Sequence, residues 1–317
     1  MKQPLRVLIS CRSEENSNGK PSGKRSEQND AVFEFAAWLA RTSDINVRGI
    51  TTFIRPWPSA SISKLGGKYH KWLKNLDSHY RNITLKGLKE SGVEKSQWDD
   101  KVSVFVDGPS ESTLLTHAAK EFDADLILLG SDAAAPKGRF LASSTADALL
   151  HSSPVPLGLV PRGVKLSKKG VTRVNYAFTN ESDDFDQGLR YAAELASTWN
   201  VPLRILSFSP EGITSAPTSR SLDISTKLSS EWRELTLAML DRARDGVLKD
   251  HPDLSVSSEI GSGWGWNGAI DALKWKKGDL LCLGSHPTDA LSRVFVGSET
   301  MEIIRNSPVP TIIYPSL

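Results

Sequence analysis

The chain has 317 residues and a formal net charge of +2, with ordinary fractions of apolar (39%) and charged (24%) residues. That length allows about two globular domains with cores of their own, and the dispersed charge argues against the concentrated basic face of a nucleic-acid-binding protein. No apolar run suits a membrane span or a signal peptide, and the two cysteines, Cys11 and Cys282, are typical of free thiols in a reducing compartment. We therefore expect a cytoplasmic protein with neither nucleic acid nor membrane as its partner.

Strands and helices alternate along the first half of the chain. The apolar run 5–10 predicts a buried strand, and the polar stretch 13–30 behind it predicts a mobile loop. Residues 162–170, RGVKLSKKG, are polar and basic and are typical of a linker. Between them the pattern predicts helix 31–42, strand 46–53, helix 61–91, strand 101–108, helix 110–121, strand 125–130, helix 144–151 and strand 155–160.

The second half follows the same order. Strand–helix alternation with right-handed crossovers indicates an α/β fold, in which a parallel sheet carries helices on both faces. The predicted elements are strand 173–178, helix 186–199, strand 202–208, helix 228–249, strand 254–260, a helix from Asn267, strand 279–284, helix 298–306 and strand 310–315.

An internal repeat explains why the two halves of the chain share one order of strands and helices. Residues 125–161 align with 279–315 without a gap, at an offset of 154. A second block pairs 35–50 with 191–206. The chain is therefore predicted to hold two copies of one domain, at 1–163 and 170–317.

The repeated motifs resemble those of the universal stress proteins. In each copy an apolar strand ends in Gly-Ser, a pair of small residues follows about a dozen residues later, and a helix, Ser-Pro-Val-Pro and a last strand complete the domain. The resemblance covers nearly the whole chain. It implies two open five-stranded parallel sheets of strand order 3-2-1-4-5, two domains that pair within the chain, and a non-catalytic stress-response protein. A homodimer and an unidentified protein partner are further expectations.

Nucleotide-binding members of that family carry G-x-x-G, nine residues and then G-S or G-T. The second copy keeps Gly284, Gly297 and Ser298, but Pro287 replaces the middle glycine and removes a backbone donor. Because glycine amides and a helix N-terminus hold phosphate oxygens, the resemblance implies a site for ATP or another adenine nucleotide here. The candidate residues of this copy are Thr179, Asn180, Gly284, Ser285, His286, Arg293, Gly297 and Ser298.

The first copy departs further from that pattern. It keeps Gly130, whereas Ala133 replaces the second glycine and Ser143-Ser144 replace Gly-Ser, so Gly130, Ser143 and Ser144 are weaker candidates. The acidic residue that the family's nucleotide binders place after the first strand is absent from both copies. Those positions read Cys11-Arg12-Ser13 and Thr179-Asn180-Glu181.

Two interpretations of these loops stay open. Gly297-Ser298 is either a phosphate site or the N-cap of an ordinary helix, with Glu299 as a first-turn acid. The charged side chains Lys137, Arg139 and Arg293 either pair with phosphate or are solvated. A chain without nucleotide, acting as a scaffold, is therefore the alternative to a nucleotide-binding protein. No Cys/His cluster, P-loop or nucleophile elbow predicts an enzyme.

A second glycine-rich stretch, GSGWGWNGA at 261–269, matches the G-x-G-x-x-G spacing of a dinucleotide loop. It follows strand 254–260, whose polar–apolar alternation suits an edge strand, and it lacks the acid that should end the next strand. We therefore expect no dinucleotide there and keep only Gly261, as a wall of the nucleotide cleft. Trp264 and Trp266 either pack in the fold or stack on a ligand base or the partner copy.

Overall fold

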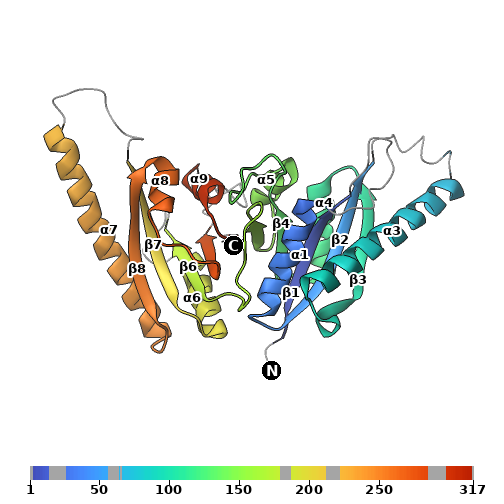
Figure 1. Ribbon diagram of the computed structural model, residues 1–317, viewed down its shortest axis with the longest axis horizontal. Helices are drawn as coiled ribbons and strands as arrows, with labels where there is room; N and C mark the ends of the chain where they lie inside the picture. The colour runs from blue at the N-terminus through green and yellow to red at the C-terminus, as the bar shows by residue number, and fades with distance from the viewer. Residues whose placement is uncertain are drawn as a thin grey trace. The chain divides into compact units, whose positions relative to one another are not determined.

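The computed structural model describes residues 3–13, 26–55, 64, 66–178, 187–211, 222–284 and 298–315. The chain divides into two compact units, Met1–Gly170 and Val171–Leu317, called unit 1 and unit 2 below. Figure 1 colours unit 1 from blue to green and unit 2 from yellow-green to red. No helix within the described ranges is long and apolar enough to cross a membrane.

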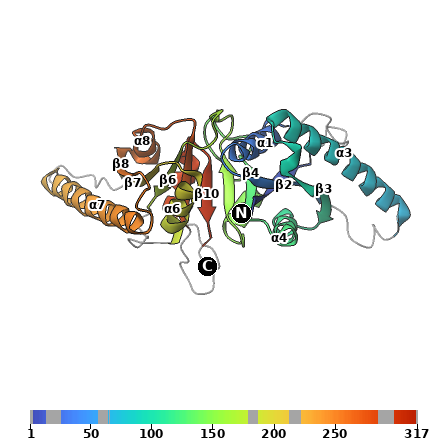
Figure 2. The ribbon, with the colours of Figure 1, turned by 90° about the horizontal axis from the view of Figure 1, so that it is seen from below.

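Unit 1 has five parallel strands in the order β3-β2-β1-β4-β5. Figure 2 shows α1 and α3 on one side of this sheet and α4 on the other; α1 packs against α3, and α4 packs against α5. The elements are β1 (Leu5–Arg12), α1 (Glu27–Ala40), β2 (Ile45–Ile54), α3 (Gly67–Ser91), a 3-10 turn (Lys95–Gln97), β3 (Trp98–Gly108), α4 (Glu111–Phe122), β4 (Leu126–Gly130), α5 (Ser144–Leu150) and β5 (Leu157–Val160).

Unit 2 repeats this arrangement with strands in the order β8-β7-β6-β9-β10, again all parallel. Figure 2 shows α8 on one side of the sheet and α6 and α7 on the other. The predicted α/β class and strand order 3-2-1-4-5 are therefore confirmed. The elements are β6 (Arg173–Ala177), α6 (Gln187–Trp199), β7 (Leu203–Glu211), α7 (Leu222–Asp250), β8 (Val256–Trp264), α8 (Gly265–Asp271), β9 (Asp279–Gly284), α9 (Ser298–Asn306) and β10 (Thr311–Tyr314).

Strand position explains the sequence patterns. The central strand β9 is buried along its whole length because helices cover both faces of the sheet. The edge strand β8 instead alternates between half-buried and exposed residues from Val256 to Ile260. The alternation that predicted an edge strand therefore reflects its true place in the sheet.

The loop predicted at 13–30 is wrong for its last residues, because α1 begins at Glu27. Ser26 is the N-cap, and its Oγ accepts a hydrogen bond from the Asn29 amide at 3.2 Å. Glu27 and Asp30 lie in the first turn, where carboxylates stabilise the amino end of a helix. A composition suited to a flexible loop thus also contains the start signal of a helix.

The stretch that begins GSGW is not a loop after β8 but the end of β8 itself, and α8 starts at Gly265 rather than at Asn267. Gly263 allows close approach to α8, since a Cβ there would lie 2.5 Å from the carbonyl carbon and oxygen of Gly268. Gly265 has φ of +65°, the left-handed conformation that turns strand into helix. These glycines therefore serve backbone packing and turning.

The two tryptophans in this stretch have different surroundings. Trp264 is 77% exposed, so the interpretation that it packs in its unit is wrong, whereas Trp266 is half-buried.

Candidate functional site

The sheet order reverses between β1 and β4 in unit 1 and between β6 and β9 in unit 2. Ligands of open α/β sheets bind outside the carboxyl ends of such strands. Gly130 ends β4 and Gly284 ends β9, so both predicted glycines lie at this edge. The candidates Thr179, Asn180, Ser285, His286, Arg293 and Gly297 lie outside the described residues.

In unit 1, β1 ends in a cation where the family resemblance implies an acid. The Arg12 amide donates to Asn29 Oδ1 at 2.9 Å, and Asn29 Nδ2 donates to the Arg12 carbonyl at 3.1 Å. Asn29 is almost fully buried, so this pair fixes the end of β1 against α1. The guanidinium then forms an ion pair with Asp132 at 3.9 Å, which links β1 to the loop after β4.

The loop after Gly130 directs its polar groups inward. The amide of Leu141 donates to Ser131 Oγ at 2.9 Å, and the amide of Asp132 donates to the Leu141 carbonyl at 2.9 Å. The amide of Ala134 donates to Asp132 Oδ1 at 2.9 Å. Three amides of this loop are therefore already bonded within the loop.

Gly130 itself is required by the packing of α1. Gln28 Nε2 donates to the Gly130 carbonyl at 2.9 Å. A Cβ on Gly130 would lie 2.6 Å from Gln28 Cγ and 2.9 Å from its carbonyl oxygen. The one glycine of the nucleotide pattern that unit 1 keeps thus has a structural role of its own.

The first turn of α5 has its own cap and a carboxylate beside it. Ser143 is the N-cap, accepting from the Ala146 amide at 3.3 Å, and exposed Ser144 is the first helical residue. The hydroxyl of Thr145 donates to Glu111 Oε2, while the Thr52 hydroxyl donates to Glu111 Oε1 at 3.1 Å. A phosphate at this helix end would meet the Glu111 carboxylate, which opposes it.

These contacts involve residues that the sequence did not single out. Glu111 follows the N-cap Ser110 and fits the ordinary role of a first-turn acid. Nothing in the sequence pairs it with Thr145, 34 positions away. Only the packing of α4 beside α5 brings the two together.

In unit 2 the described part of the crevice brings two backbones together. A Cβ on Gly188, in the first turn of α6, would lie 2.9 Å from the Cα of Gly284. Ser298 opens the nine-residue helix α9, with Glu299 in its first turn. Gly261 lies inside β8, where a Cβ would meet the Phe208 ring at 3.0 Å.

Both cysteines are buried within strands, and neither forms a disulfide. Burial raises the pKa of the Cys282 thiol far above its ordinary range, against the opposing effect of a hydrogen bond with Tyr314. The Tyr314 ring stacks on Tyr191 with centroids 5.0 Å apart. Within the described ranges, no three His, Cys, Asp or Glu side chains form a group that could hold a metal ion.

Comparisons with known proteins agree with this architecture. The model of the universal stress protein family matches residues 24–161 and 171–315. A universal stress protein of Mycobacterium tuberculosis strain H37Rv is 30% identical over 288 residues, covering 90% of this chain and 95% of the relative. A universal stress protein of Mycobacterium bovis gives the same identity and coverage.

Solved structures show the same fold. A universal stress protein from Archaeoglobus fulgidus matches with a TM-score of 0.56 and 15% identity, over 97% of each chain. A putative universal stress protein from Pseudomonas aeruginosa matches with a TM-score of 0.50 and 13% identity, over 98% of this chain and 94% of that one. The chain therefore belongs to the universal stress protein family, as a member with two of the family's domains in tandem.

Proposed function

We propose that this protein is a non-catalytic stress-response protein that binds one adenine nucleotide, such as ATP, in the crevice of unit 2. The observation that carries the proposal is the place of Gly284, which ends a buried strand next to the sheet reversal while Gly188 lets α6 approach it closely. Ser298 opens the helix that follows, as a phosphate-binding helix requires. The candidates Thr179, Asn180, Ser285, His286, Arg293 and Gly297 would complete the site, with Gly261 as a more distant wall.

The contacts in unit 1 support a single site rather than two. Arg12 is paired with Asp132 across the crevice, and Glu111 lies against the first turn of α5. Ser143 caps α5 without a ligand. Gly130, Ser143 and Ser144 are therefore proposed to stabilise unit 1 rather than to hold phosphate.

Calorimetric titration of the full chain with ATP and AMP tests this proposal. We expect one nucleotide per chain. Ser298→Tyr should weaken binding by about tenfold or more, because the ring would occupy the space of a phosphate. Ser144→Tyr is the matched control, since it also replaces an exposed first residue of a helix, and it should leave the affinity unchanged.

Three outcomes contradict parts of the proposal. If the folded protein gives no heat at millimolar nucleotide, there is no nucleotide site. If Ser144→Tyr alone abolishes binding, the site lies in unit 1. Release of phosphate from ATP that survives extensive purification and is lost in Ser298→Tyr would show an enzyme.

A second candidate function is an interaction protein that holds no nucleotide. The contacts in the crevice of unit 1 favour this function. Arg12 already forms an ion pair with Asp132, and Glu111 already accepts a hydrogen bond from Thr52. This function predicts no thermal shift with any nucleotide. It also predicts a stable complex with a protein partner or a second copy of the chain, which light scattering of the purified complex would reveal.

The two buried cysteines without a disulfide support a cytoplasmic location for either function. We also propose that the two units pair with each other within the chain. Fluorescence imaging of the tagged protein and cross-linking between the units test these two proposals.

A further inference from the structure

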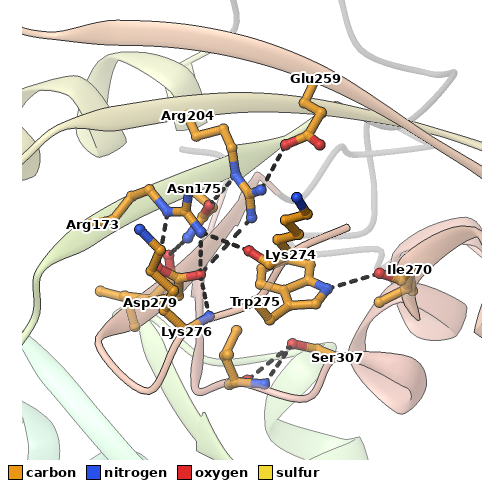
Figure 3. A network of polar contacts seen from close by, with 12 residues as sticks. Arg173, Asn175, Arg204, Glu259, Ile270, Lys274, Trp275, Lys276, Asp279 and Ser307 are labelled. Carbon is orange, nitrogen blue, oxygen red and sulfur yellow. Dashed lines mark hydrogen bonds and ion pairs between the residues drawn. The ribbon is translucent and has the colours of Figure 1, made fainter. Parts of the chain in front are cut away.

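At the amino end of unit 2's sheet, far along the strands from the nucleotide crevice, a fully buried carboxylate organises a polar network (Figure 3). Asp279, the first residue of β9, binds Arg173 through both oxygens, at 2.9 Å to Nε and 2.6 Å to Nη2. It also accepts the Lys276 amide at 2.9 Å. This carboxylate is therefore occupied mainly by Arg173 and the backbone.

Arg204 enters the same network as a second buried cation. Its side chain is only 3% exposed, its Nε donates to Asn175 Oδ1 at 2.7 Å, and its Nη1 donates to Glu259 at 2.8 Å. Its Nη2, however, has no hydrogen-bond partner among the described residues. That atom points toward Asp279 Oδ2, 3.9 Å away and too far for a hydrogen bond. A buried donor without an acceptor is unfavourable and calls for a ligand or an ordered solvent molecule.

The loop between α8 and β9, whose Lys276 amide donates to Asp279 in this network, is basic. Lys274, Lys276 and Lys277 are all exposed, and they flank half-buried Trp275. The Trp275 indole donates to the Ile270 carbonyl at 2.8 Å, and its ring lies 5.1 Å from the Arg204 guanidinium carbon. The ring of Trp275 thus packs against the guanidinium.

Positive charge outweighs negative charge among the residues of this network and of the adjoining segment 271–279. The cationic side chains are Arg173, Arg204 and the three lysines of the loop, and the anionic ones are Glu259, Asp271 and Asp279. Burial lowers the pKa of Arg204 and the neighbouring Arg173 lowers it further, against the opposing effects of Glu259 and Asp279. An additional anion would therefore be stabilised there.

The same place in unit 1 differs in charge. Residues 120–125 read KEFDAD where residues 274–279 read KWKKGD, so Glu121 and Asp123 stand beside the ring of Phe122 instead of lysines. Arg48, the repeat equivalent of Arg204, is bound to Asp99 by Nε at 3.0 Å and Nη2 at 2.7 Å. Unit 1 therefore lacks the basic loop, and the buried donor there without a hydrogen-bond partner among the described residues is Nε of Arg6 rather than a group of Arg48.

We propose that the amino end of unit 2 binds a dianionic oxyanion, a phosphate group, between Arg204 and the lysine loop 274–277. Its oxygens would accept from Nη2 of Arg204 and from the ammonium groups of the loop, as charge-assisted hydrogen bonds. Nη2 is shielded from solvent, so a phosphate can enter only when neighbouring side chains move. Glu259, which is 44% exposed and binds Nη1 of the same guanidinium, would turn outward. Glu259 is thus the internal carboxylate with which the phosphate competes.

Titration of the full chain with inorganic phosphate in a low-salt buffer tests this site. Glu259→Gln should tighten binding several-fold, because it removes the competing charge; a misfolded variant cannot produce such a gain. Replacing Lys274, Lys276 and Lys277 together with Gln should weaken binding roughly tenfold. The matched control replaces three exposed lysines of the linker, Lys165, Lys168 and Lys169, with Gln and should change the affinity less than twofold.

The indole N–H resonance of Trp275, assigned with Trp275→Phe, should shift on adding phosphate and locates the binding. The proposal is overturned if phosphate leaves this resonance unchanged, if Glu259→Gln weakens binding, or if the linker variant weakens it as much as the loop variant. Equal affinity for acetate would overturn the assignment to a dianion. Because Ser298→Tyr leaves this end of the sheet intact, it should not alter the shift of the Trp275 resonance with phosphate, so the site is tested independently of the nucleotide crevice.

Discussion

The two units place an arginine pair and an aspartate at equivalent strand positions but bury the aspartate to different depths. In unit 1, the guanidinium carbons of Arg6 and Arg48 lie 4.8 and 4.3 Å from the centre of the Phe122 ring. Asp125 is exposed and accepts a hydrogen bond from the Arg6 amide at 2.8 Å. In unit 2 the equivalent aspartate is completely buried and binds an arginine through both oxygens. A repeated set of residues therefore does not imply repeated energetics: burial decides how much each charge matters.

The largest expected change in stability comes from removing the charge of the two equivalent aspartates, Asp279 and Asp125. Asp279→Asn leaves Arg173 without its charge partner in a buried site, which should destabilise unit 2 by about 3–5 kcal/mol. Asp125→Asn removes an exposed acceptor and should destabilise unit 1 by about 1 kcal/mol or less.

Thiol labelling during urea unfolding reports the two units separately. Cys11 lies in unit 1 and Cys282 in unit 2, and both are buried, so each should react only when its own unit opens. Asp279→Asn should move the labelling of Cys282 to much lower urea and leave that of Cys11 nearly in place. Equal shifts for the two aspartate variants would show that burial does not separate them.

The ends of the two edge strands offer a second contrast. A Cβ on Gly263 would meet the backbone of Gly268 at 2.5 Å, whereas a Cβ on Gly108 would meet the flexible side chain of Leu114 at 3.0 Å. Gly263→Ala should therefore destabilise unit 2 by about 1–3 kcal/mol, because the backbone of α8 must move.

Gly108→Ala is the matched substitution in unit 1, and its cost should stay below about 1 kcal/mol because Leu114 can change rotamer. Chemical denaturation with the same labelling measures both values. If the two glycine variants lose equal stability, the close approach of β8 and α8 is not what requires Gly263.

Residues with a regular period or a repeat could be predicted from the sequence, whereas contacts between distant side chains could not. The repeat at 125–161 and 279–315 and the alternation in 254–260 led to the domain type, the strand order and the edge strand. The start of α1 was misplaced because Ser26 and its first-turn acids lie in a stretch of loop-like composition. The end of β8 was missed because glycines are ordinarily unfavourable in strands, and here they are required by the packing of α8.

The candidate crevices likewise combine features that the sequence predicts with side-chain contacts that it does not. Gly130 and Gly284 were correctly placed at the ends of their strands, since a glycine after an apolar run is a local signal. The contact of Arg12 with Asp132 and that of Glu111 with Thr145 depend on how loops and helices pack, and no spacing rule encodes them. The contacts of Arg12 and Glu111 at the crevice of unit 1 are therefore visible only in three dimensions.

The smallest expected effect concerns Glu34 of α1. In the alignment of the two repeats this position corresponds to Arg190 of α6. Although Glu34 is exposed, partial desolvation of its carboxyl group and then the neighbouring charge of Asp30 raise its pKa above the ordinary 4.5, outweighing Arg41, which lowers it. The charged form is therefore disfavoured in the folded state. This penalty is present at neutral pH and disappears as the pH falls below the ordinary pKa, where the carboxyl is protonated in both states.

Glu34→Gln should consequently raise the melting temperature by roughly 1–2 °C at pH 7 and by nothing at pH 4. Glu234→Gln, on the exposed surface of α7, is the control and should change the melting temperature at neither pH. Differential scanning fluorimetry across this pH range measures both. A stabilisation by Glu34→Gln that persisted at pH 4 would mean that the charge of Glu34 is not its cause, because at that pH the wild-type side chain is largely uncharged as well.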